Sequence, residues 1–455
     1  MSTIKSHEHW SSRTAFLFAA MGAAIGLGNL WRFPFVAGQN GGGAFVLIYI
    51  GFVIVFGMPL LISELGIGRR GQKNPISTMQ TLSKDEGRSQ KWQFIGWLSI
   101  AIPLLSLSFY SVIGGWAIYY IFEAGLDNFS AIDGVISKQN FDGFVASPWR
   151  LFAAHTVFTG LTILVVSRGI KNGIERIVKV MMPALFVLLI IMVINSVLTA
   201  DIIAGLSFLF SPDFSKITPA VVAMAMGQAF LSMGIGVGAM MTYGSYMPKN
   251  YSLAKSAATI AISDTLVAIL AGVAIFPIVF QYNLDPSGGP ELIFVTLPVA
   301  FGQMPMGYLL GIAFFLLLFF AAFSTAVGML EPTVAWLSDR GFNRVKMTLL
   351  AAGSTWLFGI VFVLSYNYWA DVRLFPMTPI LKDKNLLELA DFVITNIFIL
   401  LNAFLIAIYV GWIMARKSMV EEINLTDGLI FKSWRFVMRY LIPIAIFIIF
   451  ITNLK

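Results

Sequence analysis

The residues from Gly22 to Arg32 are the part of this 455-residue chain whose types and spacing are best suited to binding ions. They read Gly-Ala-Ala-Ile-Gly-Leu-Gly-Asn-Leu-Trp-Arg and lie inside an apolar segment. The three glycines weaken an α-helix, and Asn29 and Arg32 are costly at membrane depth. A broken membrane helix exposes peptide N–H groups that can bind an anionic group and carbonyl groups that can bind a cation. This stretch therefore predicts a broken helix lining a site for small ions and zwitterions.

A second glycine-rich stretch, Gly234-Ile-Gly-Val-Gly238, interrupts a later apolar segment. Small residues also let membrane helices pack closely, so packing alone is an alternative explanation for these glycines. Two broken helices that each open a group of five spans match an inverted repeat with its site at the repeat interface. We therefore expect a first repeat at about 14–198, a second at about 218–415 and an extra helix at about 434–452.

Isolated polar side chains within the apolar segments are further candidates. Asp264 has no basic neighbour in sequence, so its carboxylate must bind a cation, find a partner or take up a proton. We expect Glu64 to reach the membrane interface and Glu331 to be a structural hydrogen-bond partner at a proline kink. The adjacent hydroxyls of Ser324 and Thr325 suit a hard cation, although such hydroxyls usually bond to their own backbone or to a neighbouring helix.

Composition indicates a membrane protein. Hydrophobic residues make up 58% of the sequence, charged residues make up 12%, and the mean hydropathy is +0.83. Soluble proteins are about 45–50% apolar and about 25% charged. The sequence has no cysteine, which excludes disulfides and thiolate metal sites, and its three histidines are too scattered to predict a metal cluster. The net charge of +7 is explained by basic loops, so we expect no nucleic-acid partner.

Eleven apolar stretches approach or exceed the roughly 20 residues that a membrane-spanning helix needs. We predict an all-α polytopic membrane protein forming one domain, 1–455, with spans at about 14–37, 43–68, 94–123, 150–167, 174–198, 218–241, 254–282, 306–337, 345–367, 388–415 and 434–452. Loops after the even-numbered spans carry clusters of lysine and arginine, and the other loops carry mainly acids. The positive-inside rule then places the amino terminus in the cytoplasm. No cleavable signal peptide is evident.

Several motifs carry a resemblance to a known family. They are Gly22–Pro34, Asn40–Phe45, Ser167–Arg176 leading to Pro183, Gly227–Ser232 with Thr242–Tyr246, and Phe320–Thr325. These motifs resemble those of the neurotransmitter:sodium symporter family, and the similarity runs from about Trp10 to Tyr440. Eleven spans are similar to a bacterial branch that includes multihydrophobic amino acid transporters. The resemblance implies a five-plus-five inverted repeat with broken helices 1 and 6, and sodium-coupled uptake by alternating access across the bacterial inner membrane.

The resemblance also implies two sodium ions. The first sodium site would be formed by Ala24, Asn29, Ser232 and Asp264. A one-residue shift would nominate Ser263 in place of Asp264, and we prefer Asp264 because of its charge. A carboxylate beside this sodium would remove the need for chloride, so we expect chloride independence. The second sodium site would be formed by the carbonyls of Gly22, Ile25 and Ala321 and the hydroxyls of Ser324 and Thr325.

An α-amino acid is the substrate that the resemblance implies. Monoamine carriers of the family have an aspartate at the position of Gly26, so the negative charge here must come from the substrate. Its carboxylate would bind the amides of Leu27 and Gly28 and the Tyr110 hydroxyl, and its ammonium would face carbonyls of the two breaks. The whole site would be formed by Ala24, Leu27, Gly28, Ser106, Tyr110, Leu231, Ser232, Gly234, Val237, Thr325 and Met329. We expect a bulky hydrophobic or aromatic side chain and broad selectivity.

Two residue pairs would act as gates by the same resemblance. Arg32 and Asp391 would close the outer vestibule above the substrate, and Tyr246 and Asp339 would close the cytoplasmic side. Leu231 takes the place of the usual aromatic lid residue, which weakens the expected occlusion. His7 aligns with the usual amino-terminal arginine, so inner closure is a candidate for pH sensitivity.

Other classes of function fit the sequence less well. An ion channel would need a continuous polar pore, and an enzyme would need a nucleophile or metal constellation; neither pattern is present. We therefore predict a protein that is not an enzyme and whose partners are the lipid bilayer and a small hydrophobic α-amino acid. A proton-coupled amino acid transporter of the same fold, with Asp264 or Glu331 as the coupling group, stays open. The preferred amino acid, the sodium stoichiometry, proton antiport and the oligomeric state also stay open.

Overall fold

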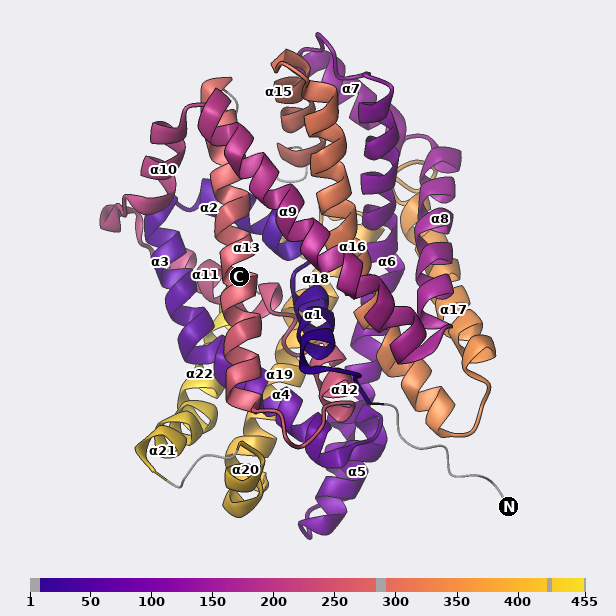
Figure 1. The fold of residues 1–455 in the computed structure, drawn as a ribbon, viewed down its shortest axis with the longest axis vertical. Helices are drawn as coiled ribbons and strands as arrows, with labels where there is room; N and C mark the ends of the chain where they lie inside the picture. Colours follow the sequence, from indigo (N-terminus) through magenta and orange to yellow (C-terminus); the bar gives the residue numbers. More distant parts are fainter. Residues whose placement is uncertain (1–8, 284–291, 424–427, 454–455) are drawn as a thin grey trace.

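A computed structural model describes residues 9–283, 292–423 and 428–453, and these residues form helices without any β-strand (Figure 1). The α-helices of the first half are α1 (Arg13–Ala24), α2 (Phe33–Gln39), α3 (Gly43–Phe52), α4 (Met58–Gly71), α5 (Pro75–Asp85), α6 (Gln93–Gly125), α7 (Gly134–Val145), α8 (Pro148–Val166), α9 (Glu175–Thr199) and α10 (Ile202–Phe210). Those of the second half are α11 (Pro219–Ser232), α12 (Ala239–Ser245), α13 (Leu253–Gln281), α15 (Leu297–Gln303), α16 (Gly307–Asp339), α17 (Arg344–Leu364), α18 (Leu386–Val393), α19 (Ile399–Ile408), α20 (Arg416–Ile423), α21 (Leu429–Phe436) and α22 (Ile442–Asn453).

Short π and 3-10 turns adjoin many of these helices and often continue them. The π turns are η1 (Gly28–Arg32), η2 (Val53–Gly57), η4 (Ile170–Ile174), η6 (Leu292–Thr296), η7 (Ile394–Phe398), η8 (Tyr409–Ile413) and η9 (Val437–Leu441), and the 3-10 turns are η3 (Gln90–Trp92) and η5 (Phe214–Lys216). Within the described ranges, nine helices are long and apolar enough to cross a membrane, and the bent pair of α1 with η1 and α2 adds a tenth. The prediction of an all-α protein with many spans is confirmed, whereas the count of eleven and the inverted repeat stay predictions.

The first predicted span breaks within the stretch that the sequence singles out. α1 ends at Ala24, and its C-cap residue Ile25 has extended backbone dihedral angles. The chain becomes helical again at Gly28, and the two parts differ in direction by 53°. The N–H groups of Gly26 and Leu27 therefore have no acceptor within a continuous helix, and they donate to side chains instead, to Asn29 Oδ1 and Tyr110 Oη.

The predicted sixth span also consists of two parts. α11 ends at Ser232 and α12 begins at Ala239, and neither is long enough to cross a membrane by itself. Between them Gly234, Gly236 and Gly238 have φ angles of +62°, +80° and +98°. Glycine adopts such angles without the steric cost that a Cβ atom would add, so these glycines permit the non-helical segment between α11 and α12.

Both breaks lie in the middle of the helical assembly, where α6 and α16 pass along each other (Figure 1). We call the two ends of the molecule in this view the α7 end, which also carries α10 and α15, and the α5 end, which also carries α20 and α21. α6 starts near α5 and ends near α7, so a residue's position along α6 shows how close it lies to each end of the molecule.

Candidate functional site

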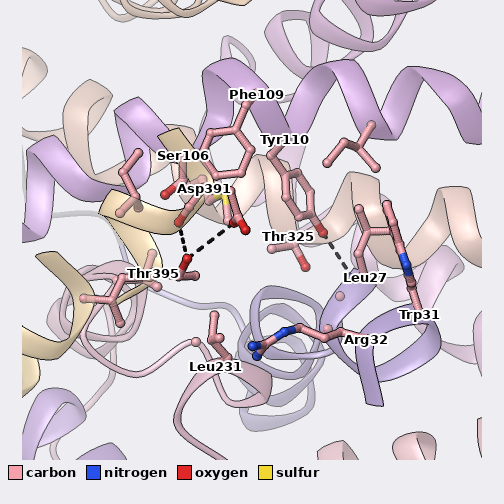
Figure 2. Close-up of a pocket in the computed structure, with 18 of the residues that line it drawn as sticks. Leu27, Trp31, Arg32, Ser106, Phe109, Tyr110, Leu231, Thr325, Asp391 and Thr395 are labelled. Atoms are coloured by element: carbon pink, nitrogen blue, oxygen red, sulfur yellow. Dashed lines mark hydrogen bonds between the residues drawn. The ribbon is translucent and has the colours of Figure 1, made fainter. Parts of the chain in front are cut away.

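A cavity of about 550 Å³ lies between the two breaks (Figure 2). Its wall includes ten of the eleven predicted substrate residues: Ala24, Leu27, Gly28, Ser106, Tyr110, Leu231, Gly234, Val237, Thr325 and Met329. The eleventh, Ser232, lies behind the wall, and its hydroxyl is 3.2 Å from Tyr49 Oη. Small-molecule sites typically occupy about 300–1,000 Å³ and combine apolar walls with a few polar groups. The cavity has the size and the character of such a site.

Polar groups of the first break meet two hydroxyls at one point of this wall. The Leu27 N–H donates a hydrogen bond of 3.3 Å to Tyr110 Oη, as the dashed line in Figure 2 shows. A Cβ atom added at Gly26 would lie 2.7 Å from Thr325 Oγ1 and 3.0 Å from Tyr110 Oη. Position 26 therefore has no room for a side chain. The peptide N–H groups and the hydroxyls around Gly26 can donate hydrogen bonds to an anionic group of a ligand. Residue 26 itself supplies no carboxylate.

The predicted first sodium site contains a pair of fully buried polar side chains. Asn29 Nδ2 donates to Asp264 Oδ1 at 2.8 Å and to the Asp264 carbonyl at 3.1 Å, and Asn29 Oδ1 accepts from the Gly26 N–H at 3.2 Å. Asp264 Oδ2 has no hydrogen-bond partner, and no ion pair reaches this carboxylate from the described residues. The hydroxyls of Ser232 and Tyr49 also lie close enough to interact with the Asp264 carboxylate. Ser263 is half-buried and is not hydrogen-bonded to Asn29.

The five residues of the predicted second sodium site lie together where α1 ends beside α16. Thr325 Oγ1 donates to the carbonyls of Gly22 and Ile25, at 3.2 Å and 3.4 Å. Ser324 Oγ donates to the Ala321 carbonyl at 3.1 Å, and a Cβ atom added at Gly22 would lie 3.4 Å from Ser324 Oγ. This group offers only carbonyl and hydroxyl oxygens and carries no charge.

Oxygen atoms of this kind suit a hard monovalent cation better than a transition metal. Among the described residues, no cluster of three or more histidine, aspartate or glutamate side chains could hold a metal ion. Asp264 is the one carboxylate in the two predicted ion sites. A single buried carboxylate can balance one positive charge, so its site fits a monovalent ion better than a divalent one.

The cavity is open toward the α7 end. Its lining on α6 runs from Ser106, near the middle of that helix, toward α7 as far as Trp116, and it reaches the exposed residues Glu388 and Asp391 on α18. The predicted outer gate is not closed, because no ion pair joins Arg32 and Asp391. Figure 2 shows the Arg32 guanidinium near Leu231 and away from Asp391.

Each residue of this outer gate has another partner. Arg32 Nη1 donates to Gln228 Oε1 at 3.1 Å, and Gln228 Nε2 donates to the Gly28 carbonyl at 2.9 Å. The Asp391 carboxylate accepts from Thr395 Oγ1 at 3.5 Å. An ion pair between solvated charges gains little free energy, so the absence of this pair in an open vestibule is physically reasonable.

The α5 end of the pathway is closed by the start of the chain. Trp10 Nε1 donates to the Tyr243 carbonyl at 3.1 Å, and the Trp10 N–H donates to the Tyr246 carbonyl at 3.2 Å. The indole ring also makes edge contacts with the rings of Tyr243 and Tyr246. These contacts hold the segment before α1 against α12.

The predicted inner pair of Tyr246 and Asp339 is not formed. Tyr246 Oη instead donates to Glu331 Oε1 at 2.9 Å, and Arg344 Nη1 donates to the same oxygen at 3.1 Å. Asp339 accepts from the backbone and side-chain amides of Asn74, at 3.1 Å and 2.9 Å. Glu331 is thus more than a partner at a proline kink, since it joins α12 to α17. The expectation for His7 lies outside the described residues.

The expectation that Glu64 reaches the membrane interface is wrong. Its side chain is fully buried, and Oε1 accepts a hydrogen bond of 2.5 Å from the N–H of Gly236 in the second break. The reason is that a broken helix leaves buried N–H groups that need an acceptor. Tyr49, Gln228 and Asn402 also bond to Ser232, to the Gly28 carbonyl and to the Gly236 carbonyl, and none of them was predicted. Polar residues in apolar spans were the signal that could have found them.

Comparisons with known proteins give matches over nearly the whole chain. The family model described as the sodium:neurotransmitter symporter family matches residues 7–131 and 135–455. An uncharacterized sodium-dependent transporter of Bacillus subtilis, YhdH, is 38% identical over 97% of this chain and 96% of its own length. One from Haemophilus influenzae is 33% identical over 99% of both chains. The crystal structure of MhsT in complex with L-phenylalanine matches with a TM-score of 0.89 and 38% identity, covering 98% of this chain and 100% of that chain.

Proposed function

Because the chain belongs to the sodium:neurotransmitter symporter family, we propose that it imports hydrophobic or aromatic α-amino acids together with sodium, by alternating access. One observation carries the substrate class. Gly26 has no room for a side chain, so this position supplies no carboxylate, and a negative charge beside the Tyr110 hydroxyl and the Leu27 N–H would have to come from the ligand. An α-amino acid supplies that carboxylate, and the apolar walls favour a large apolar side chain. The ligand in the MhsT structure, L-phenylalanine, is of this kind.

Two sodium ions are the coupling ions in this proposal. The first would bind at Ala24, Asn29, Ser232 and Asp264, close to the substrate carboxylate. The second would bind at the oxygen group of Gly22, Ile25, Ala321, Ser324 and Thr325. Because Asp264 brings its own negative charge to the first site, transport would not need chloride. The two groups of oxygen atoms described above support this assignment through their chemistry.

The arrangement of the two ends corresponds to one state of a transport cycle. In the proposal the α7 end faces outward and the α5 end faces the cytoplasm of a bacterial cell, with the amino terminus inside. The cavity is then open to the outside while Trp10 and the Tyr246–Glu331 contact close the inside. Arg32 and Asp391 would come together only when the outer vestibule closes over a bound substrate. Eleven spans, a five-plus-five inverted repeat and one transporter domain complete this proposal.

Equilibrium binding to the purified protein tests the substrate class. We expect radiolabelled tryptophan to bind in sodium and to be lost when choline replaces sodium at constant pH. Unlabelled leucine should compete, glycine should compete weakly, and tryptamine, which lacks the carboxylate, should not compete. Competition by tryptamine as strong as by tryptophan would contradict the role given to the first break.

A proton-coupled transporter of the same fold is the second candidate, and one observation favours it. Asp264 Oδ2 is buried without a hydrogen-bond partner, so this carboxyl group could carry a proton instead of binding a cation. The same binding experiment separates the two candidates. Binding that persists in choline and changes only with pH would indicate that the coupling ion is a proton and not sodium. The assignment of the substrate site would not change.

A further inference from the structure

Fully buried side chains bond to both backbone polar groups of Gly236, in the second break. Glu64 on α4 accepts from its N–H at 2.5 Å, and Asn402 Nδ2 on α19 donates to its carbonyl at 2.8 Å. Gly234 and Val237, which flank this peptide, line the cavity. Asn402 itself does not line the cavity, so any effect that it has on the wall is indirect.

Asn402 also connects this backbone to α6. Its Nδ2 donates to Ser99 Oγ at 3.1 Å, and a Cβ atom added at Gly238 would lie 2.3 Å from the Ser99 carbonyl. A Cβ atom added at Gly236 would lie 2.5 Å from the carbonyl of Ile399, which is a cavity residue one turn before Asn402. The second break therefore packs directly against α6 and α19, and Asn402 supplies hydrogen bonds across that contact.

We propose that Asn402 is a positioning residue that sets the shape of the substrate cavity by fixing the Gly236 carbonyl. This proposal rests on the proposed function only for its prediction about uptake. Leaving a buried carbonyl without a donor costs more free energy than a typical hydrogen bond contributes. Without Asn402, the segment from Gly234 to Val237 would therefore move until the Gly236 carbonyl finds another donor. The wall that faces the substrate side chain would move with it.

Asn402→Leu tests the proposal, because leucine has a similar shape and volume but no donor. With purified protein in liposomes, we expect KM for tryptophan to rise about tenfold while Vmax stays within about twofold. Ser99→Ala is a matched variant, since it leaves the bond from Asn402 to Gly236 in place and should change KM little. Thr355→Val, whose hydroxyl bonds only within α17, controls for the loss of a buried polar group elsewhere.

A second measurement needs no substrate. The chain has no cysteine, so Val237→Cys can be labelled by a water-soluble maleimide without background. We expect Asn402→Leu to raise its labelling rate about fivefold and to leave unchanged the rate of Ile113→Cys, on the α6 side of the cavity. Unchanged labelling of Val237→Cys in folded Asn402→Leu protein would overturn the proposal, as would a loss of Vmax with KM unchanged. If the unmodified protein takes up no amino acid, the proposed function fails, and the labelling result still decides the role of Asn402.

Discussion

Asn29 Nδ2 lies 2.8 Å from Asp264 Oδ1, and this buried contact joins the first break to α13 across 235 residues of sequence. The second oxygen of the same carboxylate has no hydrogen-bond partner. A fully buried carboxylate in that situation is stabilised by a cation or a proton. The pair therefore links the shape of the first break to the identity of the coupling ion.

Asp264→Asn should make transport depend on chloride. The substitution keeps the shape of the side chain but removes the negative charge beside the proposed sodium. An anion near that position can restore the charge balance, because opposite charges a few ångströms apart in a protein interior attract by several kcal/mol. We expect sodium-driven tryptophan uptake in gluconate to fall by more than about tenfold, and to recover in part when chloride is added. Uptake into proteoliposomes with and without chloride measures the effect.

Ser263→Ala is the control for this experiment, because Ser263 is the alternative that the sequence left open. Its side chain is half-buried and makes no hydrogen bond to Asn29. Uptake by this variant should stay sodium-dependent and indifferent to chloride. Chloride dependence in Ser263→Ala but not in Asp264→Asn would reverse the assignment of the carboxylate.

Ser324→Ala should weaken sodium binding without changing the substrate cavity. Ser324 Oγ belongs to the uncharged oxygen group beside Gly22, and the residue does not line the cavity. Loss of one ligand should raise the sodium concentration for half-maximal tryptophan binding by about tenfold, which corresponds to about 1.4 kcal/mol. The matched control is Ser365→Ala, which removes an equally buried hydroxyl that bonds three residues back in α17. Equal sodium curves for both variants would exclude Ser324 as a ligand.

Gly26→Ala should abolish tryptophan binding. The added methyl group would lie 2.7 Å from Thr325 Oγ1 and 3.0 Å from Tyr110 Oη, so both hydroxyls would have to move. We expect affinity to fall by at least about a hundredfold, as overpacking costs about 1–3 kcal/mol and the carboxylate loses its donors. Gly227→Ala in α11 has no heavy atom within 4 Å of the new methyl group and should bind tryptophan normally. Normal binding by Gly26→Ala would remove the main argument for an amino acid substrate.

Arg344→Gln should open the α5 end of the pathway. Arg344 pairs with fully buried Glu331, and removing one partner of a buried ion pair costs about 3–5 kcal/mol. Ser245→Cys in α12 is a buried reporter near this contact, and we expect Arg344→Gln to speed its labelling by a maleimide. Glu331→Gln should have a smaller effect, because a neutral amide can be buried at lower cost. Slower labelling in Arg344→Gln than in the parent variant would contradict the closing role of this pair.

The two breaks were predictable from sequence because glycine destabilises a helix whatever its tertiary contacts are. Gly22 and Gly26 weaken any helix that contains them, and three alternate glycines from Gly234 to Gly238 cannot continue one. The structure ends α1 at Ala24, between Gly22 and Gly26, and it ends α11 at Ser232, just before Gly234. Hydropathy likewise predicted all-helical spans, because a helix is the simplest way to satisfy backbone polar groups in a membrane.

Partners between distant helices were less predictable, because they depend on where each break lies in space. Glu64 was expected at the membrane interface, and it instead accepts from Gly236 across 172 residues. Arg32 was expected to pair with Asp391, and it instead contacts Gln228. A sequence does not determine which conformation of a transport cycle a structure represents. Tyr246 reaches Glu331 rather than Asp339 for the same reason. The family resemblance thus predicted residues that line the cavity, whereas the hydrogen bonds between distant helices became known only from the structure.

Gradient-driven uptake is the measurement that tests the central claim most directly. Purified protein in liposomes would be given an inward sodium gradient, the same gradient of choline, or a proton gradient alone, with radiolabelled tryptophan, leucine or glycine outside. We predict concentrative uptake of tryptophan and leucine in sodium, no uptake in choline and no change when gluconate replaces chloride. Uptake driven by the proton gradient alone would contradict sodium coupling, and failure to accumulate any of the three amino acids would contradict the assigned substrate class.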